Sequence, residues 1–271
     1  MVGGVVSQGR EHSWSWPLGD WDRMWRPEMW NRRPPSPHHA HLGQSAVILA
    51  LALYANVIVN EVLSPAWYIP FNLGILGVAI LVARRAGTTW TSMGMRPDRI
   101  RRGLEVGTIA VGVVIVITIV AMTTETAREV VRDERIIESS VWLSMFHALV
   151  RIPLGTALYE EVLFRGVVFG MLARRYTPLA AAFWSSLLFG VWHVLPALDA
   201  VAANPVGDLV SGAAGMGLAL LGAVVSTFIA GLGFVWIRLY ANSIVAAVLA
   251  HIGTNSTAIV AAVVVVHVLP S

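Results

Sequence analysis

The sequence predicts an all-α protein that crosses a membrane several times, and three observations support this. Of the 271 residues, 56% are hydrophobic and only 13% are charged, which is more apolar surface than a soluble domain needs. Apolar stretches of about 20 residues, the length that spans a bilayer as a helix, recur along the chain. The arginines gather in alternate connections between these stretches, as they do in polytopic membrane proteins.

Seven stretches qualify as transmembrane helices, or eight if a weaker span is also present. In chain order they cover residues 45–63, 69–83, 104–123, 142–173, 178–195, 215–237 and 243–268. The sixth is rich in glycine, which predicts close contact with neighbouring helices through Gly215, Gly217, Gly222, Gly231 and Gly233.

The basic residues predict the orientation of the helices. All 19 are arginine, and they gather in the N-terminal segment, in residues 84–102, and directly after the fourth and sixth spans. With seven spans, these four places lie on one side of the membrane. The opposite connections, 124–140 and 196–208, are acidic or nearly uncharged. The positive-inside rule therefore places the N-terminus in the cytoplasm and the C-terminus outside, and an eighth span would reverse the C-terminus.

The chain divides into three predicted parts. Residues 1–44 are rich in tryptophan, proline and arginine, and form a cytoplasmic or interfacial segment that offers a docking arm for a membrane-protein partner. Residues 45–139 hold the N-terminal transmembrane helices. Residues 140–271 form a transmembrane core that carries the polar residues considered next.

Composition excludes several kinds of chemistry. The chain has no cysteine and no lysine, so disulfides, thiolate catalysis and Schiff bases are excluded. The small net charge of +3 gives no indication of nucleic-acid binding. The composition, in which arginine is the only basic residue and alanine and valine are abundant, indicates a bacterial plasma membrane protein, whose partners are the lipid bilayer and a membrane-associated substrate.

Ionisable residues inside predicted spans are functional candidates, because each costs a few kcal/mol at the bilayer centre unless it is paired or hydrated. Two flanking histidines, His147 and His267, are interpreted as interfacial, and Arg151 is expected to snorkel or to pair locally. The remaining polar residues that share this depth are Glu160, Glu161, Arg165, His193, His251 and Asn255.

Spacing assigns different roles to the two glutamates. Glu161 and Arg165 are four residues apart, so they share a helix face and can form an ion pair. Glu160 is rotated about 100° from Glu161, which points it elsewhere and leaves it free for chemistry. Glu160 and His193 lie at equal distances from the turn between their helices, so an antiparallel hairpin brings them to the same depth.

Two more pairs have the same four-residue spacing. Phe189 lies one turn before His193, and His251 lies one turn before Asn255, so each pair faces one spot. A carboxylate beside a histidine can activate water, while histidine and asparagine can donate hydrogen bonds to an oxyanion. Together these groups suit hydrolysis of a carbonyl compound such as a peptide.

The same residues allow a second assignment. Glu160, His193 and His251 could hold a zinc ion with an open coordination position, as other sites of two histidines and a glutamate do. The spacing alone leaves both assignments open.

At these motifs the chain resembles the CAAX protease and bacteriocin-processing family of intramembrane proteases, which includes the type II CAAX prenyl endopeptidases. The three motifs occur in the family's order: Glu-Glu-x-x-x-Arg at 160–165, Phe-x-x-x-His at 189–193 and His-x-x-x-Asn at 251–255. The resemblance implies helices that enclose a catalytic cavity within the membrane.

The resemblance also implies roles for the motif residues. Glu160 and His193 activate water, and His251 and Asn255 form the oxyanion site. Glu161 and Arg165 support them, as does Phe189. The family has been described both as metalloproteases and as metal-independent glutamate proteases. The pairing of His251 with Asn255 favours the metal-independent scheme, with no cofactor, and zinc remains the alternative.

The predicted function is therefore an intramembrane endopeptidase that cleaves a membrane-associated protein or peptide. Literal CAAX processing is not favoured, because bacteria generally lack prenylated CAAX proteins. One alternative is a catalytically silent accessory or scaffold subunit of a larger membrane complex, for which the tryptophan-rich arm argues. A proton or ion transporter is a second alternative, against which the absence of a recognisable inverted repeat argues.

Overall fold

The computed structural model describes residues 42–132, 134–202 and 212–269. All regular structure in these ranges is helical, with no strand, which confirms the predicted all-α class. The tryptophan-rich arm predicted over 1–44 lies almost wholly outside the described residues.

Six helical stretches are long and apolar enough to cross a membrane, and a seventh is present if one bent pair counts as a single span. This agrees with the seven predicted spans. The three N-terminal spans are α3 (Leu42–Val57) with η2 (Ile58–Val62), η3 (Pro65–Trp67) with α4 (Tyr68–Arg85), and η4 (Pro97–Arg99) with α5 (Ile100–Ala121). The last two are α14 (Gly212–Ala241) and α15 (Ile244–His267), and between the third and fourth spans lie the short α6 (Glu125–Val131) and α7 (Glu134–Glu138).

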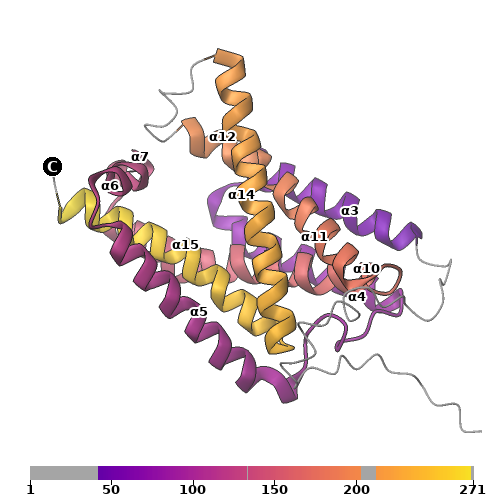
Figure 1. Cartoon of the computed structure of the whole chain (residues 1–271). Helices are drawn as coiled ribbons and strands as arrows, with labels where there is room; N and C mark the ends of the chain where they lie inside the picture. The colour runs from indigo at the N-terminus through magenta and orange to yellow at the C-terminus, as the bar shows by residue number, and fades with distance from the viewer. Residues whose placement is uncertain (1–41, 133, 203–211, 270–271) are drawn as a thin grey trace, which may run out of the picture.

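Helices α5 and α15 run side by side (Figure 1). Glycines allow this approach: a Cβ at Gly107 would meet Leu249 Cβ at 2.7 Å, and one at Gly253 would meet Val111 Cγ2 at 3.1 Å.

The glycine stripe expected in 215–237 behaves differently. A Cβ at Gly231 would meet Arg165 and Ser186, whereas Gly217, Gly222 and Gly233 have no neighbour within 4 Å. The close helix contacts therefore come mainly from glycines outside that stripe.

The fourth span is a composite helix with two widened stretches. It consists of α8 (Val141–Phe146), the π-helical η5 (His147–Ala157), α9 (Leu158–Glu160), the π-helical η6 (Glu161–Val168) and α10 (Phe169–Leu172). Pro153 lies inside η5 and has no N–H to continue an α-helical ladder. π-helical turns are rare and are frequent at functional sites. Here one ends three residues before Glu160, and the other begins at Glu161.

The fifth span breaks at His193. Helix α11 (Pro178–Trp192) and α12 (Val194–Ala202) meet at an angle of 40°. Pro196 explains the break, because it lacks the N–H that would reach the Trp192 carbonyl four residues earlier. The freed Trp192 carbonyl instead accepts a hydrogen bond of 3.0 Å from the Asn56 side chain in α3. The break therefore leaves His193 at the corner of a bent span.

The connection 86–96 closes the arginine-rich end of the bundle. Arg84, Arg174 and Arg238 each donate a hydrogen bond to a backbone carbonyl of this connection. Gly94 has a φ of +76°, and a Cβ there would meet Arg238 Nε at 2.9 Å, so glycine fits the position on both counts. The arginines thus satisfy carbonyls that have no helical partner.

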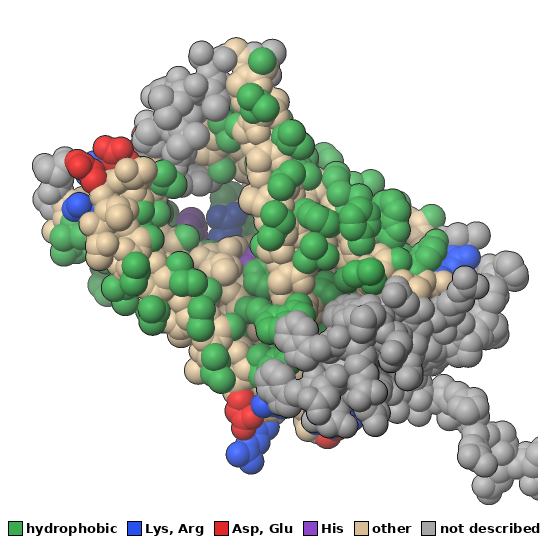
Figure 2. Space-filling model, in the orientation of Figure 1, with side chains coloured by type: hydrophobic (Ala, Val, Ile, Leu, Met, Phe, Trp, Pro, Cys, Tyr) green, Lys and Arg blue, Asp and Glu red, His purple; other side chains and the backbone are tan. Residues whose placement is uncertain are grey.

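The outer surface of the bundle is apolar. Figure 2 shows hydrophobic side chains over most of the visible face, with the charged ones gathered at its two ends. On α5, large side chains such as Ile109, Val116 and Val120 are more than half exposed. Such a surface is suited to lipid rather than to water.

Candidate active site

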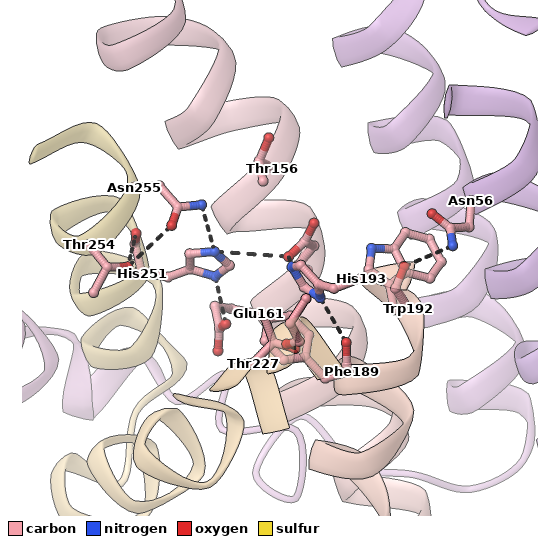
Figure 3. A network of polar contacts seen from close by, with 12 residues as sticks. Asn56, Thr156, Glu161, Phe189, Trp192, His193, Thr227, His251, Thr254 and Asn255 are labelled. Atoms are coloured by element: carbon pink, nitrogen blue, oxygen red, sulfur yellow. Dashed lines mark hydrogen bonds and ion pairs between the residues drawn. The ribbon is translucent and has the colours of Figure 1, made fainter. Parts of the chain in front are cut away.

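Three elements bring the predicted site residues together. The composite fourth span carries the two glutamates, the corner after α11 carries His193, and α15 carries His251 and Asn255 (Figure 3). Figure 3 shows His251 between Asn255 and Glu161, with His193 approaching from the other side. The equal depth predicted for Glu160 and His193 is present, since Glu160 Oε2 and His193 Nε2 are 3.8 Å apart.

Glu161 binds two partners inside the protein. Its Oε1 is 3.0 Å from Arg165 Nη1, which is the ion pair predicted from their spacing, and 2.8 Å from His251 Nδ1. Both members of the ion pair are fully buried. The guanidinium N–H groups are not aimed at the carboxylate, so the contact is a close ion pair rather than an aligned hydrogen bond. Phe189 and Phe234 hold the guanidinium, whose carbon lies 3.8 Å and 5.2 Å from their ring centres.

The Glu161 carboxylate determines which nitrogen of His251 carries a proton. A carboxylate accepts hydrogen bonds, so the facing Nδ1 must be the N–H of the neutral ring. His251 Nε2 is then an acceptor, and Asn255 donates to it through Nδ2 at 3.1 Å. The ring is further held by stacking on Phe234, with centroids 5.0 Å apart. His251 is thus oriented by a carboxylate on one side and an amide on the other.

The break at the end of α11 orients His193. The His193 amide bonds the Gly190 carbonyl rather than that of Phe189. The Phe189 carbonyl is therefore available, and the His193 ring donates to it through Nδ1 at 2.8 Å. Nε2 of the neutral ring carries the lone pair and faces Glu160. The same bend that Pro196 imposes thus aims the imidazole at the carboxylate.

The two glutamates approach His251 from different sides. Glu160 Oε2 lies 3.9 Å from His251 Nε2, while Glu161 contacts Nδ1 of the same ring. The two carboxylates therefore face opposite nitrogens of one imidazole. The backbone at both residues has α-helical dihedral angles, so the rotation of about 100° between neighbouring positions applies here.

Glu160 differs from Glu161 in its partners: Oε1 of Glu161 contacts Arg165 and His251, whereas Glu160 has no contact as short as these among the described residues. Its residue is only 6% exposed, and Oε2 is buried without a hydrogen bond among the described residues. Separations of 3.8 Å and 3.9 Å to the two histidine nitrogens are too long for direct hydrogen bonds. They are short enough for one small molecule, such as water, to bridge the carboxylate and an imidazole.

The residues as placed do not make a ready zinc site. Ligands of tetrahedral zinc with bonds of about 2.1 Å lie about 3.4 Å apart, closer than these two separations. The Nε2 lone pair of His251 also already accepts a hydrogen bond from Asn255. Across residues 42–132, 134–202 and 212–269, no group of three histidine or acidic side chains is arranged to hold a metal ion.

A cavity of about 600 Å³ adjoins the site. Asn255 and Thr156 lie in its wall, so it extends to the catalytic candidates. His147, interpreted from sequence as interfacial, also lines it. The other residues of its wall come from α6 to η5 and from α15: Val130, Val131, Ile136, Ser139, Leu143, Arg151, Ile152, Ala258, Ile259 and Ala262.

Two contributors to the site escaped the sequence analysis. Asn56 holds the Trp192 carbonyl beside His193, and Phe234 stacks on His251. Asn56 carried a usable signal, because it is an uncharged polar residue inside a predicted span. Phe234 carried none, since one more aromatic residue in an apolar span is unremarkable in sequence.

The fold and the site together define a class of protein: a polytopic helical membrane protein with a buried carboxylate–histidine centre beside an internal cavity. Residues 141–257, which include Glu160, His193, His251 and Asn255, match the Rce1-like type II CAAX prenyl endopeptidase family. No curated protein and no solved structure matches the chain.

Proposed function

We propose that the chain is an intramembrane endopeptidase in which Glu160 and His193 activate the water that attacks a peptide bond. The observation that carries the proposal is the unpartnered Glu160 oxygen, 3.8 Å from the lone-pair nitrogen of His193. The match of residues 141–257 to a family of prenyl endopeptidases supports the reaction class. The substrate is a membrane-associated polypeptide, since the site lies among helices that are apolar enough to span a bilayer.

The first step forms a bond between the water oxygen and the substrate carbonyl carbon. A water held between Glu160 and His193 loses a proton to one of these two acceptors as it attacks. The carbonyl oxygen becomes an oxyanion, which needs donors aimed at it. Both neutral histidines present lone pairs rather than N–H groups at Nε2, so the donor must come from another residue.

Asn255 supplies that donor in the proposed scheme. One hydrogen of its amide bonds His251 Nε2, and the second is available to the oxyanion. His251 holds the amide in place, and Glu161 with Arg165 holds His251. His251 and Asn255 thus form the oxyanion site as a unit, in which the amide donates and the imidazole positions it.

The second step breaks the carbon–nitrogen bond. The proton taken from water passes to the departing amine, and the carbonyl carbon becomes the new carboxyl group. No proton, electron or co-reactant beyond water is required. Glu160 and His193 end in their starting protonation states, so the centre can turn over.

The test is cleavage of a quenched-fluorescence peptide library by the purified full chain in detergent. Glu160→Gln keeps the shape of the side chain but removes the carboxylate, and we expect cleavage to fall by at least about a hundredfold. Glu105→Gln is the matched control, because Glu105 is half-exposed and pairs with Arg101 on the surface. This control should cleave as the unaltered chain does.

Three outcomes would count against the proposal. Equal cleavage by Glu160→Gln and the unaltered chain would remove Glu160 from the reaction. Loss of cleavage with a chelator, restored by added zinc, would replace the metal-independent scheme by a metal-dependent one. Absence of cleavage by the unaltered chain across the library would favour the catalytically silent accessory role.

A further inference from the structure

Arg151 is a charged side chain inside a membrane span for which the proposed reaction has no use. It lies in η5, ten residues after the start of the Val141–Leu172 span, and is partly buried. An arginine at such a depth is costly unless it is paired or hydrated. Among the described residues, no carboxylate lies within ion-pair distance of it.

Tyr68 holds the guanidinium of Arg151. The Arg151 Cζ atom lies 4.1 Å from the centre of the Tyr68 ring, as in a cation–π contact. The Tyr68 hydroxyl is fixed in turn by a 3.0 Å hydrogen bond with Thr156 Oγ1. A Cβ at Gly155 would meet the Tyr68 ring at 2.8 Å, so glycine lets the ring lie against the helix. The guanidinium is therefore oriented before any ligand arrives.

Stacking occupies a face of the guanidinium and leaves its edge for hydrogen bonds. The five N–H donors of arginine lie in the plane of the group and match the two oxygens of a carboxylate. No hydrogen bond from Arg151 is made to any other described residue. A stacked arginine with its donors unused is well prepared to bind a planar anion.

The surroundings of Arg151 complement an anion within an otherwise apolar chain. Among the described residues that line the 600 Å³ cavity, Arg151 is the only arginine and none is acidic. Most of the other side chains there are aliphatic. The same cavity reaches Asn255 of the proposed oxyanion site.

We infer that this cavity is a substrate-binding subsite in which Arg151 binds a carboxylate of an apolar polypeptide segment. The inference rests on the proposed peptidase function, because it treats the cavity as the place where the chain next to the cleaved bond is held. The anion that Arg151 binds is therefore part of the substrate. The carboxylate has two sources, an acidic side chain or the free C-terminus.

The position of Arg151 sets a distance from the cleaved bond. It precedes Glu160 by nine residues, which is at most about 13 Å along the axis, because the π-helical stretch between them rises less per residue than an α-helix. An extended peptide advances about 3.3 to 3.6 Å per residue, so the carboxylate lies within about four residues of the bond that is cleaved. Peptides with the carboxylate much closer or much farther should be cut less well.

The test is binding by the full-length Glu160→Gln variant, which does not depend on catalysis. The probes are dye-labelled apolar octapeptides, measured by fluorescence anisotropy in an uncharged detergent. One pair differs only in a free or an amidated C-terminus, and a second amidated pair differs only in one internal Glu or Gln. We expect the carboxylate member of at least one pair to bind about tenfold more tightly, and the pair that responds identifies the source.

Three further variants locate the effect. Arg151→Gln, added to Glu160→Gln, should remove the preference for the carboxylate while leaving the binding of the neutral peptides unchanged. Arg151→Lys keeps the charge without the planar fork, and should retain part of the preference. Arg101→Gln is the matched control, since Arg101 is exposed and pairs with Glu105 outside the cavity, and it should retain all of it.

Two results would overturn the subsite. One is a carboxylate preference that survives Arg151→Gln in a variant that elutes as a single species. The other is equal or absent binding of both members of each pair to Glu160→Gln. Failure of the proposed function is a separate result, because it is measured by peptide cleavage in a chain that keeps Arg151. The subsite is measured by peptide binding to the Glu160→Gln variant.

Discussion

At the scale of single residues, the bend at His193 shows how backbone geometry prepares a side chain. Pro196 removes one amide donor, and two carbonyls near the end of α11 lose their helical partners. The His193 ring takes one of them and Asn56 takes the other. Both hydrogen bonds keep His193 Nε2 aimed at Glu160. Asn56 thus positions the reaction centre from a different helix.

Asn56→Ala should disturb this arrangement. It leaves the buried Trp192 carbonyl without a donor, which costs about 1 to 3 kcal/mol. We also expect the rate constant kcat for peptide cleavage to fall roughly ten- to a hundredfold, with KM little changed, because His193 loses its fixed position. Steady-state kinetics and a thermal melt of the same detergent preparation measure both effects.

Leu53→Ala is the control for Asn56→Ala. Leu53 lies in the same helix, α3, and is 51% exposed. Its effect on kcat should be small. A kcat loss as large in Leu53→Ala as in Asn56→Ala would show that general weakening of α3, rather than loss of the Trp192 contact, causes it.

Sequence spacing predicted some of these contacts and missed others for physical reasons. The Glu161–Arg165 ion pair depends only on two positions one helical turn apart, so it could be predicted. The approach of both glutamates to His251 depends on how α15 packs against the fourth span, which spacing within one helix does not report. Asn56 acts across 136 residues of sequence, and only the packing of α3 against the end of α11 reveals its partner.

At the scale of helices, the number of spans followed from apolar length, but their contacts did not. Glycine was expected to mark close packing along 215–237. On the lipid-facing side of α14, however, it has no protein neighbour to approach. Where α11 crosses α14 the situation reverses, because a Cβ at Gly190 would lie 2.7 Å from the Val224 carbonyl oxygen. The difference depends on which face of a helix meets protein, and hydropathy does not report this.

This contrast gives a matched pair of substitutions. Gly190→Ala forces a backbone carbonyl to move, and should destabilise the fold by about 1 to 3 kcal/mol. Gly222→Ala places the same methyl group in open space within α14, and should be neutral or stabilise by up to about 1 kcal/mol through helix propensity. The midpoint of thermal unfolding in detergent compares the two, and a similar loss in both would refute the close-contact explanation.

At the scale of the whole molecule, the two ends of the helical bundle differ in charge, and the cavity lies towards only one of them. The connection 86–96 is fastened by three arginines at one end. At the other end, α6 and α7 carry several acidic residues, and Val130, Val131 and Ile136 from these helices line the cavity. The cavity is thus built from the half of the molecule away from the arginine-rich connections.

This asymmetry predicts the side of the membrane from which substrate reaches the site. Because arginine-rich connections stay in the cytoplasm, we expect α6, α7 and the cavity wall to face the opposite side. The chain has no cysteine, so single cysteines can be introduced without background labelling. Glu138 lies at the end of α7, and Tyr176 lies in the arginine-rich turn before α11. Both residues are exposed, so the substitutions Glu138→Cys and Tyr176→Cys place one cysteine at each end.

In intact bacterial cells that express these two variants, a membrane-impermeant maleimide should label the cysteine at position 138. The cysteine at position 176 should react only after the membrane is permeabilised. The expected substrate is then a membrane-anchored polypeptide that presents its cleaved segment outside the cytoplasm. The reverse pattern would invert the molecule and make the cavity accessible from the cytoplasm. Labelling of both sites in intact cells would contradict a single orientation set by the arginines.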